Sequence, residues 1–326
     1  MNGTIAAVVV TYNRKSLLTE CLDALLGQTR SLDMIILVDN ASTDGTPELL
    51  DELGYLDNAL IDYVRLPQNL GGAGGFYTGI KRGYQAGYHW LWVMDDDAEP
   101  EPSALECLCR SEVTNSPETV AVACKKIGKD ARIQAHHRAW FSERRGLVPV
   151  PAHEYAEEQV RIDHSSFVGL AIRSSVITSA GLPRQDFYIW CDDLEYCLRM
   201  GQHGEIWLIN SSIIKHKDDP VPSNRYRWLL WTPEKLLPVE VFWKQLCGWR
   251  NMEYIRRTYG AGSVPRSLWR LLKRVGKIVV LEDHKLFRLG WTLVFYVDSF
   301  QPRFRARPPM PRTITTMEER RGVAKR

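Results

Sequence analysis

Residues 89–102 read HWLWVMDDDAEPEP, and this stretch decides the fold. An aromatic and apolar run ends abruptly in the three carboxylates Asp95, Asp96 and Asp97, and prolines follow. The run has the length and character of a strand that is buried on both faces. Three adjacent like charges repel one another. We therefore expect a compensating positive charge, from another part of the chain or from a bound cation.

Upstream of this strand, apolar runs alternate with amphipathic segments. Strands are predicted for TIAAVVVTY (4–12), MIILVDN (34–40) and LIDYVRL (60–66). Helices are predicted for KSLLTECLDALLGQ (15–28), STDGTPELLDEL (42–53) and GFYTGIKRGYQAG (75–87). This alternation, which continues to about residue 125, indicates an α/β fold with a mostly parallel, Rossmann-like sheet flanked by helices.

The rest of the chain divides less regularly. Residues 126–165 fit a hairpin or a long excursion, 165–183 a strand and a helix, and 206–217 one or two strands. Helical spacing then favours helices over 239–260, 263–280 and 284–300. We expect a catalytic domain over 1–235, a C-terminal helical, basic extension over 236–300 and a loose basic tail over 301–326.

Composition and local patterns argue against a secreted protein with a signal peptide, a membrane-spanning protein and a zinc-ribbon protein. The 326 residues are 44% hydrophobic and 25% charged, as in soluble globular proteins. The N-terminal MNGTIAAVVVTYNRK has no basic region before its apolar run, and the late apolar run GWTLVFYV is too short to span a bilayer. The seven cysteines are odd in number and lack zinc-ribbon spacing, which favours reduced thiols. We therefore expect a cytoplasmic protein.

Polar side chains follow each predicted strand of the first half. They are Thr11-Tyr12-Asn13, Asp39-Asn40, Gln68-Asn69 and the aspartate triplet. Because ligands of such sheets bind beyond the carboxyl ends of the strands, these clusters predict a site at that edge. Asp95 and Asp97, two positions apart, present carboxylates to the same side, where Mg²⁺ or Mn²⁺ would bind. A solvated acidic turn is the plain alternative.

Two other segments carry weaker signals. Four glycines within residues 71–75 let the backbone approach a ligand, and the following helix offers its N-terminal amides to an anion. The spacing is that of neither a Walker loop nor a dinucleotide loop, and a plain turn is the alternative. Asp192 and Asp193 fit ordinary helix caps, and an isolated His216 fits a structural role, unless both belong to a wider pattern.

Such a pattern exists. VVVTYNR (8–14), ILVDNASTDGT (36–46), LPQNLGGAGGF (66–76), MDDDAEP (94–100) and WCDDLEYCLR (190–199) resemble, in order and spacing, the family 2 glycosyltransferases of the GT-A fold. The resemblance covers roughly residues 4–220. The Gly-rich and triple-Asp segments are most similar to the galactofuranosyltransferase and rhamnosyltransferase branch.

The resemblance implies a role for each matching residue. The nucleotide and donor sugar would contact Thr11, Tyr12, Arg14, Asp39, Asn69, Gly71, Gly72, Gly74, Gly75 and Asp96. Mn²⁺ or Mg²⁺ would bind Asp95, Asp97 and His216. Asp193 would be the catalytic base, with Asp192 and Trp190 on the acceptor side. Cys191 separates Trp190 from the aspartate pair, which leaves the local register open.

The implied activity is transfer, with inversion, of a sugar from a nucleotide-diphosphate donor to a glycan or polyprenyl-linked acceptor in bacterial cell-surface polysaccharide synthesis. UDP-galactofuranose is the first donor suggested and dTDP-rhamnose the second. Two other classes stay open: a non-catalytic nucleotide-sugar-binding protein, and a nucleotidyltransferase. The latter normally carries a Gly-rich loop with Lys or Arg after its first strand, where this chain has TYNRKS.

The C-terminal third has its own character. From residue 240 onward the chain carries 19 Lys and Arg against 7 Asp and Glu, interleaved with tryptophans. Basic amphipathic helices with aromatic residues can lie on an anionic membrane face, which predicts peripheral membrane contact. Packing on the body of the protein or on a second subunit of a homo-oligomer is the alternative. Nucleic-acid binding is not expected, because no recognised module accompanies the basic residues.

Overall fold

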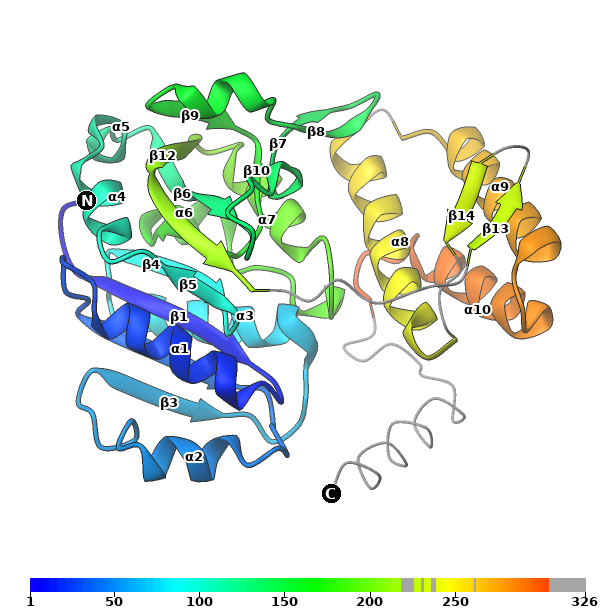
Figure 1. Cartoon of the computed structure of the whole chain (residues 1–326). Coiled ribbons are helices and arrows are strands. Elements are labelled where there is room, and N and C mark those ends of the chain that lie inside the picture. Colours follow the sequence, from blue (N-terminus) through cyan, green and yellow to red (C-terminus); the bar gives the residue numbers. More distant parts are fainter. Residues whose placement is uncertain (218–225, 230–231, 236–238, 261, 305–326) are drawn as a thin grey trace. The chain divides into compact units, whose positions relative to one another are not determined.

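A computed structural model describes residues 1–217, 226–229, 232–235, 239–260 and 262–304 (Figure 1). The chain forms two compact units. The N-terminal unit comprises Met1–Gln185 and Asp192–Asp218, and the C-terminal unit comprises Asp186–Cys191 and Asp219–Arg326. A short segment that directly precedes Asp192 thus belongs to the C-terminal unit. Most of the predicted tail lies outside the described residues.

The N-terminal unit is built on one mixed sheet. Its strand order is β3-β2-β1-β4-β11-β6-β12-β5, and β9 pairs with β12. The strands are β1 Ile5–Thr11, β2 Met34–Asp39, β3 Ile61–Arg65, β4 Trp90–Asp95, β5 Ala98–Pro100, β6 Thr119–Ile127, β9 Gln159–Ile162, β11 Leu170–Arg173 and β12 Glu205–His216. β3, β2, β1 and β4 are parallel, as β6 and β12 are, while β11 runs antiparallel between β4 and β6. The predicted α/β architecture is confirmed.

Helices cover both faces of this sheet. They are α1 Lys15–Leu26, α2 Thr46–Glu52, α3 Gly71–Gln85, α4 Ala104–Arg110, α5 Glu112–Asn115, α6 Ser175–Ala180 and α7 Asp192–Met200. Alternate residues of β1 enter two separate cores: Val8 packs with Phe76 and Ile80 of α3, and Val9 packs in the core that contains Leu18 and Leu22 of α1. Because both faces are covered, every residue of β1 is buried, and all of them except the terminal Thr11 are apolar.

The Gly-rich segment differs from the expected loop, because it forms the first turn of α3. A Cβ atom at Gly75, Gly79 or Gly83 would collide with Val10, Val8 or Leu91 of the sheet. These glycines therefore let α3 pack closely against β1 and β4. Gly71 has a left-handed φ of +74°, and a Cβ at Gly72 would meet no atom. Of the four predicted donor-contacting glycines, Gly75 thus has a packing role of its own.

Of the two structures predicted for residues 126–165, a hairpin and a long excursion, the structure contains the hairpin. β7 (Arg138–Ser142) and β8 (Gly146–Pro149) are antiparallel, and β10 (His164–Ser165) pairs with β7. Short 3-10 turns, η1 (Ala135–His137) and η2 (Ala152–Ala156), flank the hairpin, and a third, η3 (Gln185–Phe187), precedes α7. The segment thus forms a small second sheet and also contributes β9 to the main sheet, rather than forming an irregular excursion.

The C-terminal unit is mainly helical. α8 (Val239–Tyr259), α9 (Val264–Leu281) and α10 (Lys285–Asp298) match the three predicted helices, and β13 (Tyr226–Leu229) pairs with β14 (Thr232–Lys235). Its core joins Tyr188 to Phe242, Trp243, Leu246, Cys247, Ile278 and Phe295. Within the described part of the chain, no helix has both the length and the apolar character that crossing a membrane requires.

Candidate functional site

The predicted polar clusters meet at one edge of the sheet. β1, β2 and β4 end together, since Thr11 is paired with Asp39 and Val10 with Asp95. The aspartate triplet thus begins where β4 ends, beside the polar ends of its neighbours. Parallel register is what places these side chains next to one another.

Asp96 points back into the protein. Its Oδ2 accepts hydrogen bonds from the Thr11 hydroxyl at 2.7 Å and from the Tyr12 N–H at 3.3 Å, and its Oδ1 lies 3.4 Å from Arg14. The side chain is buried. Asp96 therefore fixes the chain that follows β1, and its predicted contact with the donor stays a prediction.

Asp97 is held between two basic side chains. Arg14 contacts its Oδ2, and His216 Nε2 lies 3.1 Å from its Oδ1. His216 ends β12, and the pairing of β12 with β5 sets it opposite Ala98. Sheet pairing thus brings a residue from the end of the N-terminal unit to the triplet.

Asp95, Asp97 and His216 together form a candidate metal centre. Each offers one ligand atom, and the three atoms lie within 4.8 Å of one another. Two carboxylates and one imidazole are a donor set that suits Mn²⁺ and, less fully, Mg²⁺. The residues present therefore fit the divalent cation expected from the sequence.

The electrostatics of the triplet show why a cation is favoured there. Burial, followed by the charges of Asp97 and Asp96, raises the pKa of Asp95 well above its usual range, and buried Lys126 opposes this. Burial likewise raises the pKa of Asp96 to about 6. Burial also acts on Asp97, but His216 and Arg14 outweigh it and lower its pKa. The ionised form of Asp97 is thus stabilised by its two partners, whereas burial and the neighbouring carboxylates disfavour ionised Asp95, which a bound cation would stabilise.

The residues predicted to contact the nucleotide differ in their exposure to solvent. Tyr12 is exposed beyond the end of β1. Asp39 is fully buried, and its oxygens accept hydrogen bonds from the Ser42 N–H and the Tyr63 hydroxyl, both at 2.8 Å. Direct contact between Asp39 and a base or ribose therefore requires this fully buried side chain to become accessible, although each of its oxygens can accept a further hydrogen bond.

Two asparagines of the predicted polar clusters, to which no individual role was assigned, shape this region. Asn40 accepts a hydrogen bond from the Leu70 N–H and donates one to the Gly71 carbonyl, which fixes the start of α3. Asn13 has a left-handed φ of 56° and accepts a hydrogen bond from the Thr43 N–H at 2.7 Å. Predicted Asn69 accepts from the Gly71 N–H at 2.7 Å. The signal in the sequence was the position of Asn13 and Asn40 directly after strands.

Asp192 and Asp193 begin α7. Asp192 is buried, and burial, followed by the charge of Asp193, raises its pKa to about 7. Asp193 is partly exposed, and its Oδ1 accepts a hydrogen bond from the Leu194 N–H at 2.7 Å. Asp193 also interacts electrostatically with Arg138, a fully buried side chain that donates to the Cys124 and Val168 carbonyls. The two adjacent aspartates therefore occupy unlike environments.

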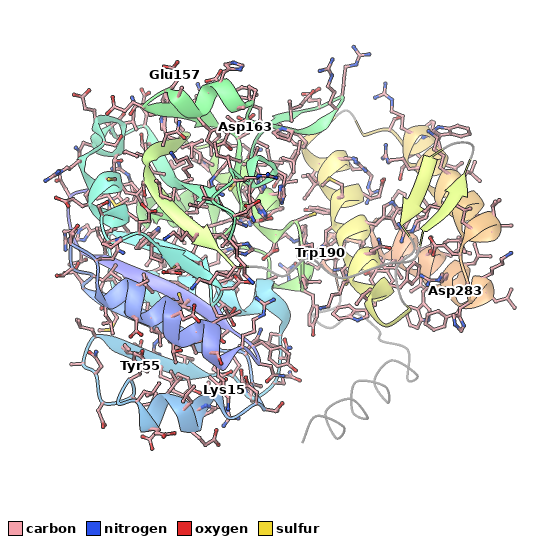
Figure 2. The ribbon with its side chains drawn as sticks, viewed as in Figure 1. Lys15, Tyr55, Glu157, Asp163, Trp190 and Asp283 are labelled. Carbon is pink, nitrogen blue, oxygen red and sulfur yellow. The ribbon has the colours of Figure 1, made fainter. Side chains whose placement is uncertain are left out.

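The turn before α7 is strained. Tyr188, Trp190 and Cys191 have left-handed φ angles of 65°, 64° and 65°, which non-glycine residues rarely adopt. Buried Asn251 of α8 holds this turn, because its amide donates to the carbonyls of Phe187, Ile189 and Trp190 at 3.0, 3.2 and 2.8 Å. The Trp190 side chain is 46% exposed (Figure 2). Asn251 was not predicted, because nothing in its local sequence indicates this distant contact.

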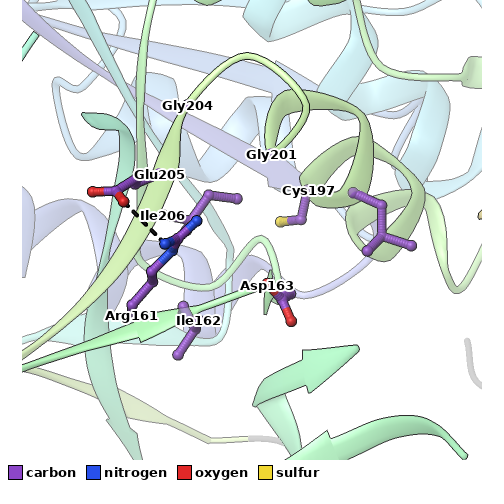
Figure 3. A pocket seen from close by; sticks show the side chains of 9 residues that line it. Arg161, Ile162, Asp163, Cys197, Gly201, Gly204, Glu205 and Ile206 are labelled. Atoms are coloured by element: carbon purple, nitrogen blue, oxygen red, sulfur yellow. Dashed lines mark ion pairs between the residues drawn. The ribbon is translucent and has the colours of Figure 1, made fainter. Parts of the chain in front are cut away.

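A separate small cavity of about 120 Å³ lies elsewhere in the N-terminal unit, between β9, the C-terminal end of α7 and β12 (Figure 3). An ion pair of 3.1 Å between Arg161 and Glu205 borders it. The cavity is lined by Arg161, Ile162, Asp163, Cys197, Leu198, Gly201, Gly204, Glu205 and Ile206, so none of the predicted site residues contributes to it.

Comparison with known proteins places this geometry in context. The model of the family described as Glycosyl transferase family 2 matches residues 6–172. Galactofuranosyltransferase GlfT1 of Mycolicibacterium smegmatis is 30% identical over 213 residues, which cover 61% of this chain and 66% of that protein. Abequosyltransferase RfbV of Salmonella typhimurium is 31% identical over 140 residues, 42% of this chain and 41% of that protein. This chain thus spans slightly less than two thirds of GlfT1.

A solved structure extends the likeness over most of the chain. The crystal structure of GalNAc-T7 with UDP, GalNAc and Mn²⁺ aligns with a TM-score of 0.59 and 16% identity, over 91% of this chain and 55% of that one. At that identity the match concerns the fold alone.

Proposed function

This chain belongs to glycosyl transferase family 2, and on that premise we propose that it transfers a sugar from a nucleotide-diphosphate donor to a hydroxyl group of a glycan or lipid-linked acceptor, with inversion at the anomeric carbon. The observation that carries the proposal is the grouping of Asp95, Asp97 and His216 at the carboxyl edge of the sheet. A protein that only binds nucleotide sugars does not need the partly exposed Asp193 as well.

The donor side of the reaction depends on charge. Asp95, Asp97 and His216 would hold Mn²⁺ or Mg²⁺, which would supply Lewis-acid neutralisation of the departing diphosphate. Arg14, half exposed beside Asp97, is positioned to exchange its carboxylate partners for a phosphate oxygen. The first turn of α3, beyond Gly71, offers backbone N–H groups to the same anion.

The acceptor side depends on Asp193. Its carboxylate accepts the proton of the acceptor hydroxyl while that oxygen bonds to the anomeric carbon and the bond to the diphosphate breaks. One direct displacement inverts the configuration. Asp192 and Trp190 remain our proposed acceptor contacts: Trp190 offers an exposed ring for stacking on a sugar, and Asp192 adjoins the base.

We favour UDP-galactofuranose as the donor, because the segments around residues 66–76 and 94–100 resemble that branch and GlfT1 is a galactofuranosyltransferase by name. dTDP-rhamnose is the alternative donor from the same resemblance. Synthesis of bacterial cell-surface polysaccharide and a cytoplasmic location remain predictions.

Purified full chain should be incubated with a panel of nucleotide sugars and Mn²⁺ or Mg²⁺, and the released products measured. We expect free nucleoside diphosphate from one donor, most from UDP-galactofuranose, and loss of release after chelation. Release of pyrophosphate would instead indicate a nucleotidyltransferase. Nucleotide binding without any release, even with acceptor glycans present, would indicate a non-catalytic binding protein.

A further inference from the structure

Helices α9 and α10 expose an unusual amount of apolar surface. On α9 the exposed apolar side chains are Val264, Leu268, Trp269, Leu272, Val279 and Val280, and on α10 they are Leu286, Leu293, Val294 and Val297. Leu286 is 88% and Val297 63% exposed. Scattered apolar residues are ordinary on protein surfaces, but two adjacent helices with continuous stripes mark a site of interaction.

The side chains of α9 fall into three sectors of the helix. Ser267, Leu271 and Ile278 are buried on one side. Leu268, Leu272 and Val279, at helical spacing, form the exposed apolar sector. Three basic side chains beside this sector, Arg266, Lys273 and Lys277, are exposed or partly exposed. The other two basic residues of α9 face α8: Arg270 pairs with Glu253, and Arg274 lies over the Phe242 and Trp249 rings. An apolar sector beside a cationic one is the pattern of a helix that lies in a membrane interface.

The residues of α10 divide in a similar way. Leu286, Leu293 and Val297 are exposed on one side, while Arg288, Thr292 and Phe295 are buried on the opposite side. We call the exposed apolar residues of the two helices the α9–α10 face.

The buried sides of both helices meet α8. The Ser267 hydroxyl of α9 donates to Glu253 at 2.7 Å, and the Arg288 guanidinium of α10 lies 4.6 Å from the centre of the Phe242 ring. The stripes of both helices therefore point away from α8. Figure 1 shows the three helices grouped in the C-terminal unit.

Charge identifies the occupant of this face. α9 carries five basic residues and no acidic residue. In the described residues 262–304 the acidic side chains are Glu282, Asp283 and Asp298. The first two pair with Arg288, and Asp298 pairs with Arg250. The solvent side of α9 thus presents basic and apolar side chains and no acidic side chain of its own, which complements an anionic surface with an apolar interior.

We propose that the α9–α10 face binds the interface of a bilayer that contains anionic phospholipid, with both helices lying in the membrane plane. A second copy of the chain is a poorer occupant, because it would bring two basic sectors together, and lysine is depleted in the cores of protein interfaces. Membrane binding needs no sugar transfer, so this proposal stands apart from the proposed reaction.

The full chain should be sedimented with vesicles of phosphatidylcholine alone and of phosphatidylcholine mixed with phosphatidylglycerol. We expect binding to the mixed vesicles that weakens with salt. The triple variant Leu268→Ser, Leu272→Ser, Val279→Ser should reduce the partition coefficient about tenfold or more. Lys273→Gln with Lys285→Gln should reduce it about fivefold for each charge removed. All five side chains are exposed, so the variants should fold as the wild type does.

Matched controls lie in the N-terminal unit. Leu53→Ser with Leu60→Ser removes exposed apolar groups, and Arg144→Gln with Arg145→Gln removes exposed charges. Neither should change vesicle binding. Failure of the wild type to bind mixed vesicles, or equal binding by the triple variant, overturns the proposal. So does light scattering that shows a dimer which the triple variant abolishes while vesicle binding is unaffected.

Discussion

His216 Nε2 lies 3.1 Å from Asp97 Oδ1, although more than a hundred residues separate the two in the chain. The contact exists because β12 extends far enough to pair with β5, directly after the aspartate triplet. It adds an imidazole to the two carboxylates of Asp95 and Asp97. It also answers how the chain tolerates the triplet: Arg14 and His216 compensate Asp97, and the remaining charge favours a bound cation.

Replacing His216 should therefore weaken metal binding. We expect His216→Ala to reduce the affinity for Mn²⁺ about tenfold or more, because one ligand of three is lost. Calorimetric titration of the metal-free protein with Mn²⁺ measures this directly. His203→Ala, at an exposed position of the same unit, is the control. Equal Mn²⁺ affinity in His216→Ala and the wild type would remove His216 from the metal centre.

Arg14 should act on metal and nucleotide in opposite directions. Its guanidinium contacts both Asp96 and Asp97, so it competes with a cation for the same negative charge. We expect Arg14→Gln to bind Mn²⁺ alone more tightly, by about 1 kcal/mol, and to bind UDP in the presence of Mn²⁺ more weakly. Arg14→Lys keeps the charge, so its affinities for Mn²⁺ and for UDP should lie between those of the wild type and those of Arg14→Gln. Weaker binding of Mn²⁺ alone by Arg14→Gln would show that Arg14 does not compete with the metal.

The sequence was informative about the strand ends and much less so about the contacts that hold them. Thr11, Asp39 and Asp95 were predictable as neighbours, because buried parallel strands end at a common edge. The full burial of Asp39 was not, since its hydrogen bond to Tyr63 depends on how β2 and β3 pair.

Contacts between residues far apart in the chain, and the packing of α3 on the sheet, could not be predicted from the sequence either. The turn before α7 is held by Asn251, which lies 61 residues after Trp190 in the chain. Nothing in a local pattern reports such a contact. The glycines at 71–75 were interpreted as a ligand-binding loop before a helix over 75–87, whereas they form the first turn of α3, and Gly75, Gly79 and Gly83 recur at helical spacing toward the sheet.

The close packing of α3 gives a stability prediction. A methyl group at Gly79 would collide with Val8 Cγ1 in the core, where neighbours cannot move freely. We expect Gly79→Ala to lower the free energy of unfolding by about 1–3 kcal/mol. Gly72→Ala, where a Cβ meets no atom, should be neutral or stabilising by up to about 1 kcal/mol. Urea unfolding of both variants tests this, and equal stability of the two would contradict the packing role.

The raised pKa of Asp192 predicts a pH-dependent stability. Because burial raises its pKa to about 7, the folded protein binds this proton more tightly than the unfolded chain does. The stabilisation is therefore present at low pH and is lost as pH rises towards about 7. Asp192→Asn removes this loss, so the variant should gain about 2 kcal/mol over the wild type between pH 5 and pH 8. Urea unfolding at both pH values measures this gain, with exposed Asp57→Asn as control. If the difference in free energy of unfolding between Asp192→Asn and the wild type were the same at pH 5 and pH 8, the raised pKa of Asp192 would be contradicted.

The assignment of Asp193 as the base yields the most direct test of mechanism. Asp193→Asn keeps the size of the side chain and its position at the start of α7, but its amide cannot take a proton from an acceptor hydroxyl. We expect the transfer rate to fall by a factor of about 10²–10⁴, while calorimetry shows unchanged binding of UDP with Mn²⁺, because the donor side depends on other residues. Exposed Asp51→Asn should transfer sugar as the wild type does. If Asp193→Asn turned over at the wild-type rate, the base would have to be sought elsewhere. If it lost UDP binding as well, Asp193 would belong to the donor site rather than to the acceptor side.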